Sequence, residues 1–95
     1  MIKKVLDVRE GVGSFPKQDL DSLVGSEKIK ETPFSWGKEL AYGEYNGCSI
    51  TLCVPGNPHM KTQQIHISGE VKAVERVVEE FQERYSWAKN SSSVY

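Results

Sequence analysis

The clearest pattern in the chain is a series of apolar residues near the C-terminal end that recur at spacings of three and four. Charged residues fill the positions between them. This period is that of an amphipathic α-helix with one buried stripe, which we place at residues 70–85. Ser68 is its predicted N-cap, and the polar composition of residues 89–95 predicts a flexible tail. The stripe consists of Val71, Val74, Val77, Val78, Phe81 and Tyr85.

The dipeptide Asn46-Gly47 predicts the tip of a β-hairpin, because these residues tolerate the positive φ angles of a tight two-residue turn. With this pair at the tip, Tyr45 faces Cys48 and, further along the ladder, Tyr42 faces Thr51. Alternation of side chains then gives the hairpin two different faces. The apolar face is expected to carry Tyr45, Ala41, Cys48, Ile50, Leu52 and Val54, and the polar face Tyr42, Glu44, Ser49 and Thr51 with Leu40 and Cys53.

A third strand is predicted at residues 61–68, after a loop at residues 55–60 that contains prolines and a glycine. Ile65 and Ile67 alternate in it with Gln64 and His66, so this strand also has one apolar side and one polar side. Pairing through the loop would place Ser49 opposite His66. The C-terminal helix is then expected to cover the apolar face of an antiparallel sheet.

The N-terminal third predicts a strand, a short helix and a connector. Residues 2–8 predict the strand, with Leu6 and Val8 directed inward, while Ile2, Val5 and Leu6 also fit a helical turn. Residues 16–24 predict the helix, which Gly25 ends. Residues 26–37 are interpreted as a connector because Thr32-Pro33 interrupts any regular pattern, with Phe34 and Trp36 as anchors.

The predicted fold is therefore α+β: a small antiparallel sheet of about four strands, in the order β-α-β-β-β-α, packed on one face by the amphipathic C-terminal helix. Residues 1–88 are predicted to form a single domain.

Charge and composition narrow the function classes. The 12 basic and 13 acidic residues are interleaved and leave a net charge of −1, so the sequence has no electrostatic signature of a nucleic-acid-binding protein. No apolar run approaches the length of about 18 residues that crosses a membrane, and none resembles a signal peptide. Cys48 and Cys53 are an odd number of positions apart, which directs them to opposite faces of one strand and prevents a disulfide. These features predict a cytoplasmic protein.

Catalytic and metal sites have little support in the sequence. Gly11-Val12-Gly13-Ser14 lacks the remaining residues of a phosphate-binding loop, and the histidines and cysteines lack metal-ligand spacing. A row of Glu44, Ser49 and His66 would put serine, not histidine, in the middle, which is the wrong order for a hydrolase triad. His66 is expected about 13 Å along the sheet from Cys53, too far to activate the thiol. We therefore predict no catalytic residues, no metal and no cofactor.

The strand and helix formed by Gln64-Ile65-His66-Ile67-Ser68-Gly69 and Ala73-Val74-Glu75-Arg76 resemble the last strand and helix of single-strand RNA-binding domains such as the KH family. The resemblance covers about a quarter of the chain, and the Gly-x-x-Gly backbone clamp of the family is missing. The function of the family is therefore not carried over to this chain.

The leading hypothesis is a non-catalytic interaction or regulatory module that uses the polar face of the sheet to dock a protein or a small polar ligand. A nucleic-acid or nucleotide binder is the alternative, and a small enzyme with a histidine acid–base group is the second alternative. No membrane partner is expected, while exposed strand edges would permit a homo-oligomer. The candidate binding surface consists of Tyr42, Glu44, Ser49, Thr51, Gln64 and His66.

Overall fold

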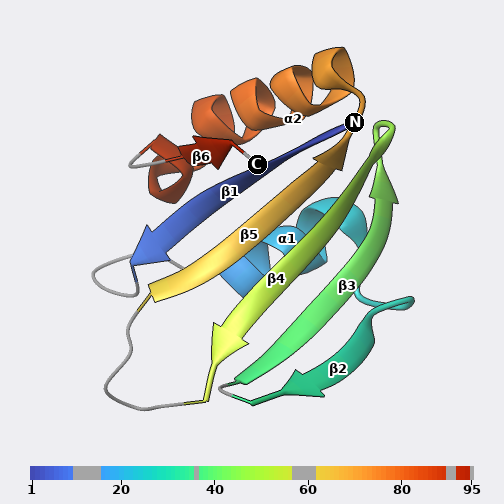
Figure 1. Ribbon diagram of the computed structural model, residues 1–95, viewed down its shortest axis with the longest axis vertical. Coiled ribbons are helices and arrows are strands. Elements are labelled where there is room, and N and C mark those ends of the chain that lie inside the picture. Colours follow the sequence, from blue (N-terminus) through green and yellow to red (C-terminus); the bar gives the residue numbers. More distant parts are fainter. Residues whose placement is uncertain (10–15, 36, 57–61, 90–91, 95) are drawn as a thin grey trace.

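A computed structural model describes residues 1–9, 16–35, 37–56, 62–89 and 92–94, which form one antiparallel sheet and its helices (Figure 1). The strands lie in the order β2-β3-β4-β5-β1-β6. In chain order the elements are β1 (Ile2–Arg9), α1 (Pro16–Val24), β2 (Lys30–Phe34), β3 (Gly37–Tyr45), β4 (Cys48–Pro55), β5 (Thr62–Gly69), α2 (Val71–Arg84), the 3-10 helix η1 (Ser86–Lys89) and β6 (Ser92–Val94).

The α+β class and the packing of the C-terminal helix on one face of the sheet are confirmed. The strand number is larger than about four, because the sheet has five strands of five to nine residues and the three-residue β6. The interpretation of residues 26–37 as a connector is wrong, since β2 lies within it. Pro33 is tolerated in β2 because this strand is at the edge of the sheet, where a proline need not remove a ladder hydrogen bond.

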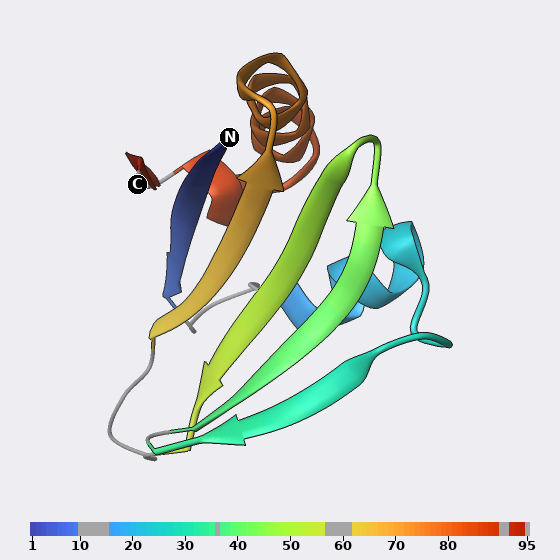
Figure 2. The ribbon, with the colours of Figure 1, turned by 45° about the vertical axis from the view of Figure 1, so that its right-hand side comes forward.

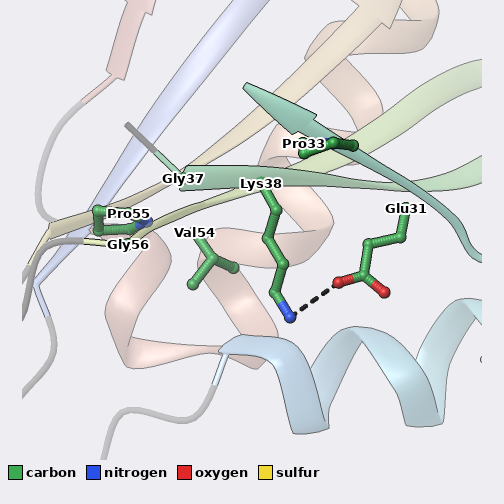
Figure 3. Close-up of a pocket in the computed structure, with 7 residues that line it drawn as sticks. All are labelled: Glu31, Pro33, Gly37, Lys38, Val54, Pro55 and Gly56. Atoms are coloured by element: carbon green, nitrogen blue, oxygen red, sulfur yellow. Dashed lines mark ion pairs between the residues drawn. The ribbon is translucent and has the colours of Figure 1, made fainter. Parts of the chain in front are cut away.

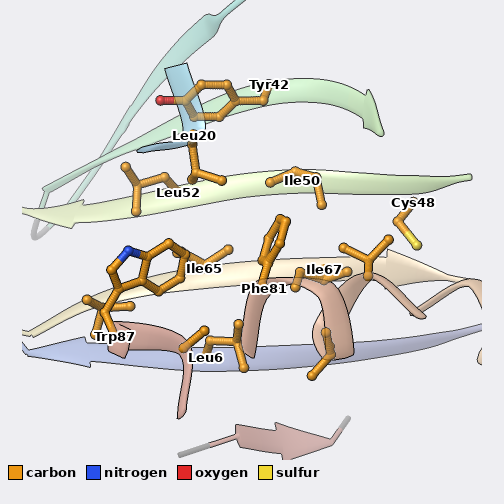
Figure 4. Close-up of a cluster of buried hydrophobic side chains, with 14 of the residues drawn as sticks. Leu6, Leu20, Tyr42, Cys48, Ile50, Leu52, Ile65, Ile67, Phe81 and Trp87 are labelled. Carbon is orange, nitrogen blue, oxygen red and sulfur yellow. The ribbon is translucent and has the colours of Figure 1, made fainter. Parts of the chain in front are cut away.

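Both helices and η1 lie on the same side of the sheet (Figures 1 and 2), where α2 buries Val74, Val77, Val78 and Phe81 of its predicted stripe. Val71, at the start of the stripe, is exposed instead, and Tyr85, at its end, is half-buried and follows the helix. Burial of each large apolar side chain contributes roughly 1.5–3 kcal/mol, so this layer is the main source of stability. α1 adds Leu20 to the same core (Figure 4). Fully buried members from the sheet and α2 include Leu6, Ile50, Leu52, Ile65, Ile67, Val74, Val77 and Phe81.

Trp87 of η1 joins the two helices over this core. Its indole Nε1 donates a hydrogen bond to the Asp19 carboxylate of α1 at 2.8 Å, and its ring stacks on Tyr85 with the ring centroids 4.9 Å apart.

The predicted domain boundary at residue 88 does not include β6, which pairs with β1. The predicted N-cap Ser68 belongs instead to β5, and Glu70 is the N-cap of α2. Among the described residues, no helix has the length and apolar character needed to cross a membrane.

The hairpin tip at Asn46-Gly47 is confirmed, with φ angles of 50° and 85°. Tyr45 faces Cys48 as predicted, but a β-bulge then interrupts the pairing between Ala41 and Gly43. Tyr42 is the extra residue, and Gly43 has a φ of 90°, which glycine adopts without steric cost. From this point the register differs by one residue from the predicted register.

The bulge reverses the predicted orientation of three residues of β3. Leu40 and Tyr42 turn toward the helices, where each is 3% exposed, and Ala41 turns to the opposite face beside Thr51. The prediction that Tyr42 belongs to the polar face is therefore wrong. The physical reason is that one inserted residue exchanges the faces of all residues on one side of it.

Tyr42 connects β3 to α1. Its hydroxyl donates a hydrogen bond to Asp21 Oδ1 at 2.5 Å, while Lys17 Nζ lies 2.9 Å from Asp21 Oδ2. These two interactions, that of Tyr42 being the stronger, hold the pKa of the Asp21 carboxyl below its ordinary value. Burial raises the pKa of the Tyr42 hydroxyl above its ordinary value, so it remains a donor.

Replacement of Tyr42 by phenylalanine should lower the free energy of unfolding by about 1 kcal/mol, because it removes a hydrogen bond to a carboxylate but keeps the buried ring. The pKa of Asp21 should rise toward its ordinary value. Urea denaturation and NMR titration of the Asp21 carboxyl measure the two effects. In an Asp21→Asn background the stability cost should shrink, and an unchanged denaturation midpoint for Tyr42→Phe would contradict the assigned role.

Candidate functional site

The second face of the sheet carries no described helix, and we call it the open face (Figures 1 and 2). Its composition follows from the pairing registers, because residues directly opposite each other on neighbouring strands project to the same side. The described side chains that the register directs to it are Lys3, Val5, Asp7, Lys30, Thr32, Phe34, Glu39, Ala41, Glu44, Ser49, Thr51, Cys53, Pro55, Gln64, His66 and Ser68.

The structure places Glu44, Ser49, Thr51, Gln64 and His66 on the open face and Tyr42 in the core. The predicted register between the second and third strands is wrong by two residues, since Thr51, not Ser49, lies opposite His66. An even shift keeps every residue on its predicted face, which is why the polar residues still gather together.

The middle of the open face is uncharged and its border is charged. Thr51 lies between Ala41 and His66, and His66 lies opposite Val5 of β1. Val5 and Cys53 are only 3% and 5% exposed. Lys3, Asp7, Lys30 and Glu44 stand toward the outer strands and the ends of the rows, and Glu39 of β3 lies between Thr32 and Cys53.

A chain of hydrogen bonds fixes the central histidine. Gln64 Nε2 lies 3.2 Å from Asp7 Oδ1, and Gln64 Oε1 lies 3.2 Å from His66 Nε2. Because an ionised carboxylate only accepts hydrogen bonds, the amide nitrogen of Gln64 must face Asp7 and its oxygen must face His66. His66 Nε2 is therefore the protonated nitrogen, and Nδ1 carries the lone pair of the neutral ring.

Burial lowers the pKa of His66 below its ordinary value, and the positive charge of Lys3 acts in the same direction. The carboxylates of Glu39 and Asp7 oppose this shift but are weaker. His66 is accordingly neutral near pH 7, and the Nε2–H tautomer is the form that the open face presents.

Sequence reasoning did not find Lys3, Val5 or Asp7 as members of the surface. The alternation in residues 2–8 directs these three away from the core once Leu6 and Val8 point inward. The missing information was that β1 pairs with β5, which a sequence pattern does not give. The bulge determines that Ala41 and Glu39 project to the open face. The register of β5 determines which residues lie beside Cys53.

The arrangement gives weak support to nucleophilic catalysis. Ser49 lies beside Ser68 and not beside His66, so the predicted row of Glu44, Ser49 and His66 is wrong. Cys53 is diagonal to His66 and closer than the sequence analysis expected, because it lies opposite Gln64. Burial first, and the charge of Glu39 second, raise the pKa of the Cys53 thiol, which disfavours the nucleophilic thiolate.

The remaining candidates from the sequence fall in different places. Gly11-Val12-Gly13-Ser14 lies outside the described residues, and so does His59, the second histidine of the sequence and the other candidate for an acid–base group. Cys48 and Cys53 are free thiols on opposite faces, as predicted. Within the described parts of the chain, no group of three or more histidine, cysteine, aspartate or glutamate side chains could hold a metal ion.

Comparisons with known proteins find no relative of this chain: no protein-family model matches it, and neither a curated protein nor a solved structure does. The case for a function therefore depends on the geometry of the open face.

The lowered pKa of His66 predicts a pH dependence of stability. In the unfolded chain His66 takes up a proton near its ordinary pKa of 6.5, while the folded protein resists protonation. The contribution of His66 to the free energy of unfolding should therefore have its full value above pH 6.5 and decrease as the pH falls below 6.5. The decrease should be at most about 1.4 kcal/mol per pH unit and should end when the pH reaches the pKa of His66 in the folded protein.

His66→Gln should remove this contribution, and urea denaturation of both proteins across the pH range measures the difference in slope. His59 is present in both proteins, so its contribution cancels. An NMR titration in which His66 of the folded protein has an ordinary or raised pKa would refute the prediction.

Proposed function

We propose that this chain is a non-catalytic interaction module that binds a partner protein through the open face. The observation that supports the proposal most directly is the distribution of charge, with an uncharged middle around Thr51 and His66 and charged residues at the border. Protein interfaces have this composition, because charged groups are costly to desolvate in the centre and are tolerated at a wetter rim.

The dimensions of the open face favour a protein over a small ligand. Five strands at a spacing of about 4.8 Å and about six residues along each strand give an area of roughly 500 Å². Two such surfaces would bury about 1,000 Å², which is the size of a transient protein interface. Glu44 lines one of three cavities, the one beside the end of α1, but Ser49, Thr51, Gln64 and His66 line none of the three.

The side chains of the middle are suited to close approach. Ala41, Ser49, Thr51 and Cys53 are small, so the backbone of a partner can reach the sheet surface. The charged border then sets orientation more than affinity, because exposed ion pairs contribute little energy but disfavour wrong alignments. A cytoplasmic location belongs to the same proposal, and two cysteines that are free thiols fit a reducing compartment.

Nucleic-acid binding has less support on this surface. The border carries the carboxylates of Asp7, Glu39 and Glu44 beside the amines of Lys3 and Lys30. The aromatic residue expected for base stacking, Tyr42, lies in the core. Binding through several phosphates would weaken steeply with increasing salt, whereas binding through an uncharged middle would not.

Ser49→Arg should abolish capture of the partner, because it places a long charged side chain at an exposed position on β4 without disturbing the core. The matched control is Glu79→Arg, which introduces the same side chain at an exposed position of α2 on the other side of the sheet. Affinity capture from the native host, with quantitative mass spectrometry of the wild type and both variants, measures the effect.

A protein that is recovered with the wild type and Glu79→Arg, but at least about tenfold less with Ser49→Arg, would support the proposal. If no recovered protein distinguishes the two variants, the open face is not the binding surface. If the component lost with Ser49→Arg is RNA or DNA, with steep salt dependence, the nucleic-acid alternative replaces it.

A further inference from the structure

A cavity of about 570 Å³ lies at the end of β2, β3 and β4, on the side of the sheet that faces the helices (Figure 3). Val54, Pro33 and Pro55 provide apolar walls. Among the described residues, none from α1 or α2 lines it, so this end of the sheet extends beyond the helix layer. The volume is within the range of small-molecule sites, which is about 300–1,000 Å³.

The backbone beside the cavity is held in a close contact. A Cβ atom at Gly37 would lie only 2.1 Å from the carbonyl oxygen of Val54, so the start of β3 approaches β4 at a distance that only glycine permits. Val54 and Pro55 pair with Lys38 and Gly37 in the ladder between β3 and β4, which holds them in place relative to β3. A wall that is in place before binding reduces the entropy lost when a ligand binds.

An ion pair stands at the cavity. Lys38 Nζ lies 2.9 Å from Glu31 Oε1, and the two side chains are 49% and 56% exposed. Figure 3 shows both side chains projecting to the same side of the sheet as Val54. An ion pair with this exposure is weak and can open at little cost. When it opens, a cation and an anion stand side by side next to an apolar wall.

We propose that this cavity binds a small zwitterion with an apolar side chain, namely an apolar α-amino acid. Its carboxylate would pair with Lys38, its ammonium group with Glu31, and its side chain would lie against Val54, Pro33 and Pro55. One ion pair is thereby exchanged for two. A ligand with only a carboxylate would displace Glu31 and leave that negative charge beside its own, and a ligand with only an amine would do the same to Lys38. Lys38, Glu31 and Val54 project to the opposite side of the sheet from the open face, so the site does not depend on the function of that face.

Three matched ligands test the proposal by NMR titration of the backbone amides. L-phenylalanine carries both charges, 3-phenylpropanoate only the carboxylate and 2-phenylethylamine only the ammonium group. Concentrations up to about 10 mM detect the millimolar affinities usual for ligands of this size. We expect saturable shifts at Glu31, Lys38 and Val54, with L-phenylalanine bound at least about threefold more tightly than either of the other two.

Lys38→Gln and Glu31→Gln should each remove this preference, because each deletes one of the two pairings while keeping the length of an exposed side chain. Lys30→Gln is the matched control, since Lys30 lies on the same strand as Glu31 but projects to the open face, and it should leave the preference intact. No saturable shift with L-phenylalanine, equal binding of the three ligands, or an unchanged preference in Lys38→Gln would each overturn the proposal.

Discussion

The insertion of one residue into β3 determines what both faces of the sheet carry. Because side chains alternate along a strand, a continuous ladder from the Asn46-Gly47 tip would direct Leu40 and Tyr42 outward and Ala41 inward. The bulge at Tyr42, made possible by the positive φ of Gly43, reverses these three. Leu40 and Tyr42 thereby complete the layer under the helices, and Ala41 becomes part of the uncharged middle of the open face. The core and the candidate surface depend on the same irregularity.

This dependence links elements that are distant in the sequence. Above the bulge, β3 reaches the hairpin tip, and the hydroxyl of Tyr45 donates a hydrogen bond to Glu80 of α2. At the bulge, Tyr42 holds Asp21 of α1. Below it, Lys38 stands beside the cavity. β3 therefore contacts both helices on one side of the sheet and contributes to the open face on the other. A displacement of β3 would change the packing at each of these places.

The parts of the fold that could be predicted are those with a local cause. The period of the α2 stripe, the tip at Asn46-Gly47 and the alternation around Ile65 and Ile67 each arise within a few residues. The parts that could not be predicted depend on contacts between distant segments. Gly43 is a sequence signal for the bulge, but it does not identify one, because glycine also occurs in strands for other reasons. The register of β5 against β4 places Ile50, Leu52, Ile65 and Ile67 together in the core, and a loop length alone does not give that alignment. For the candidate site, the polar alternation identified Glu44, Ser49, Thr51, Gln64 and His66, while Lys3 and Asp7 required the pairing of β1 with β5.

The hydrogen-bond chain from Asp7 through Gln64 to His66 restricts what could bind the open face in the way we propose. The chain uses the Nε2 proton of His66 and leaves Nδ1 as an acceptor. A partner must then place a donor, such as a backbone N–H or a hydroxyl group, at this point, because an acceptor there would face a lone pair and lose its water without replacement. His66 is neutral at every pH above its lowered pKa, so a partner needs this donor over that whole pH range. The middle of the open face is thus uncharged, but its hydrogen-bonding groups have fixed donor and acceptor positions. This property distinguishes it from a surface that only faces water.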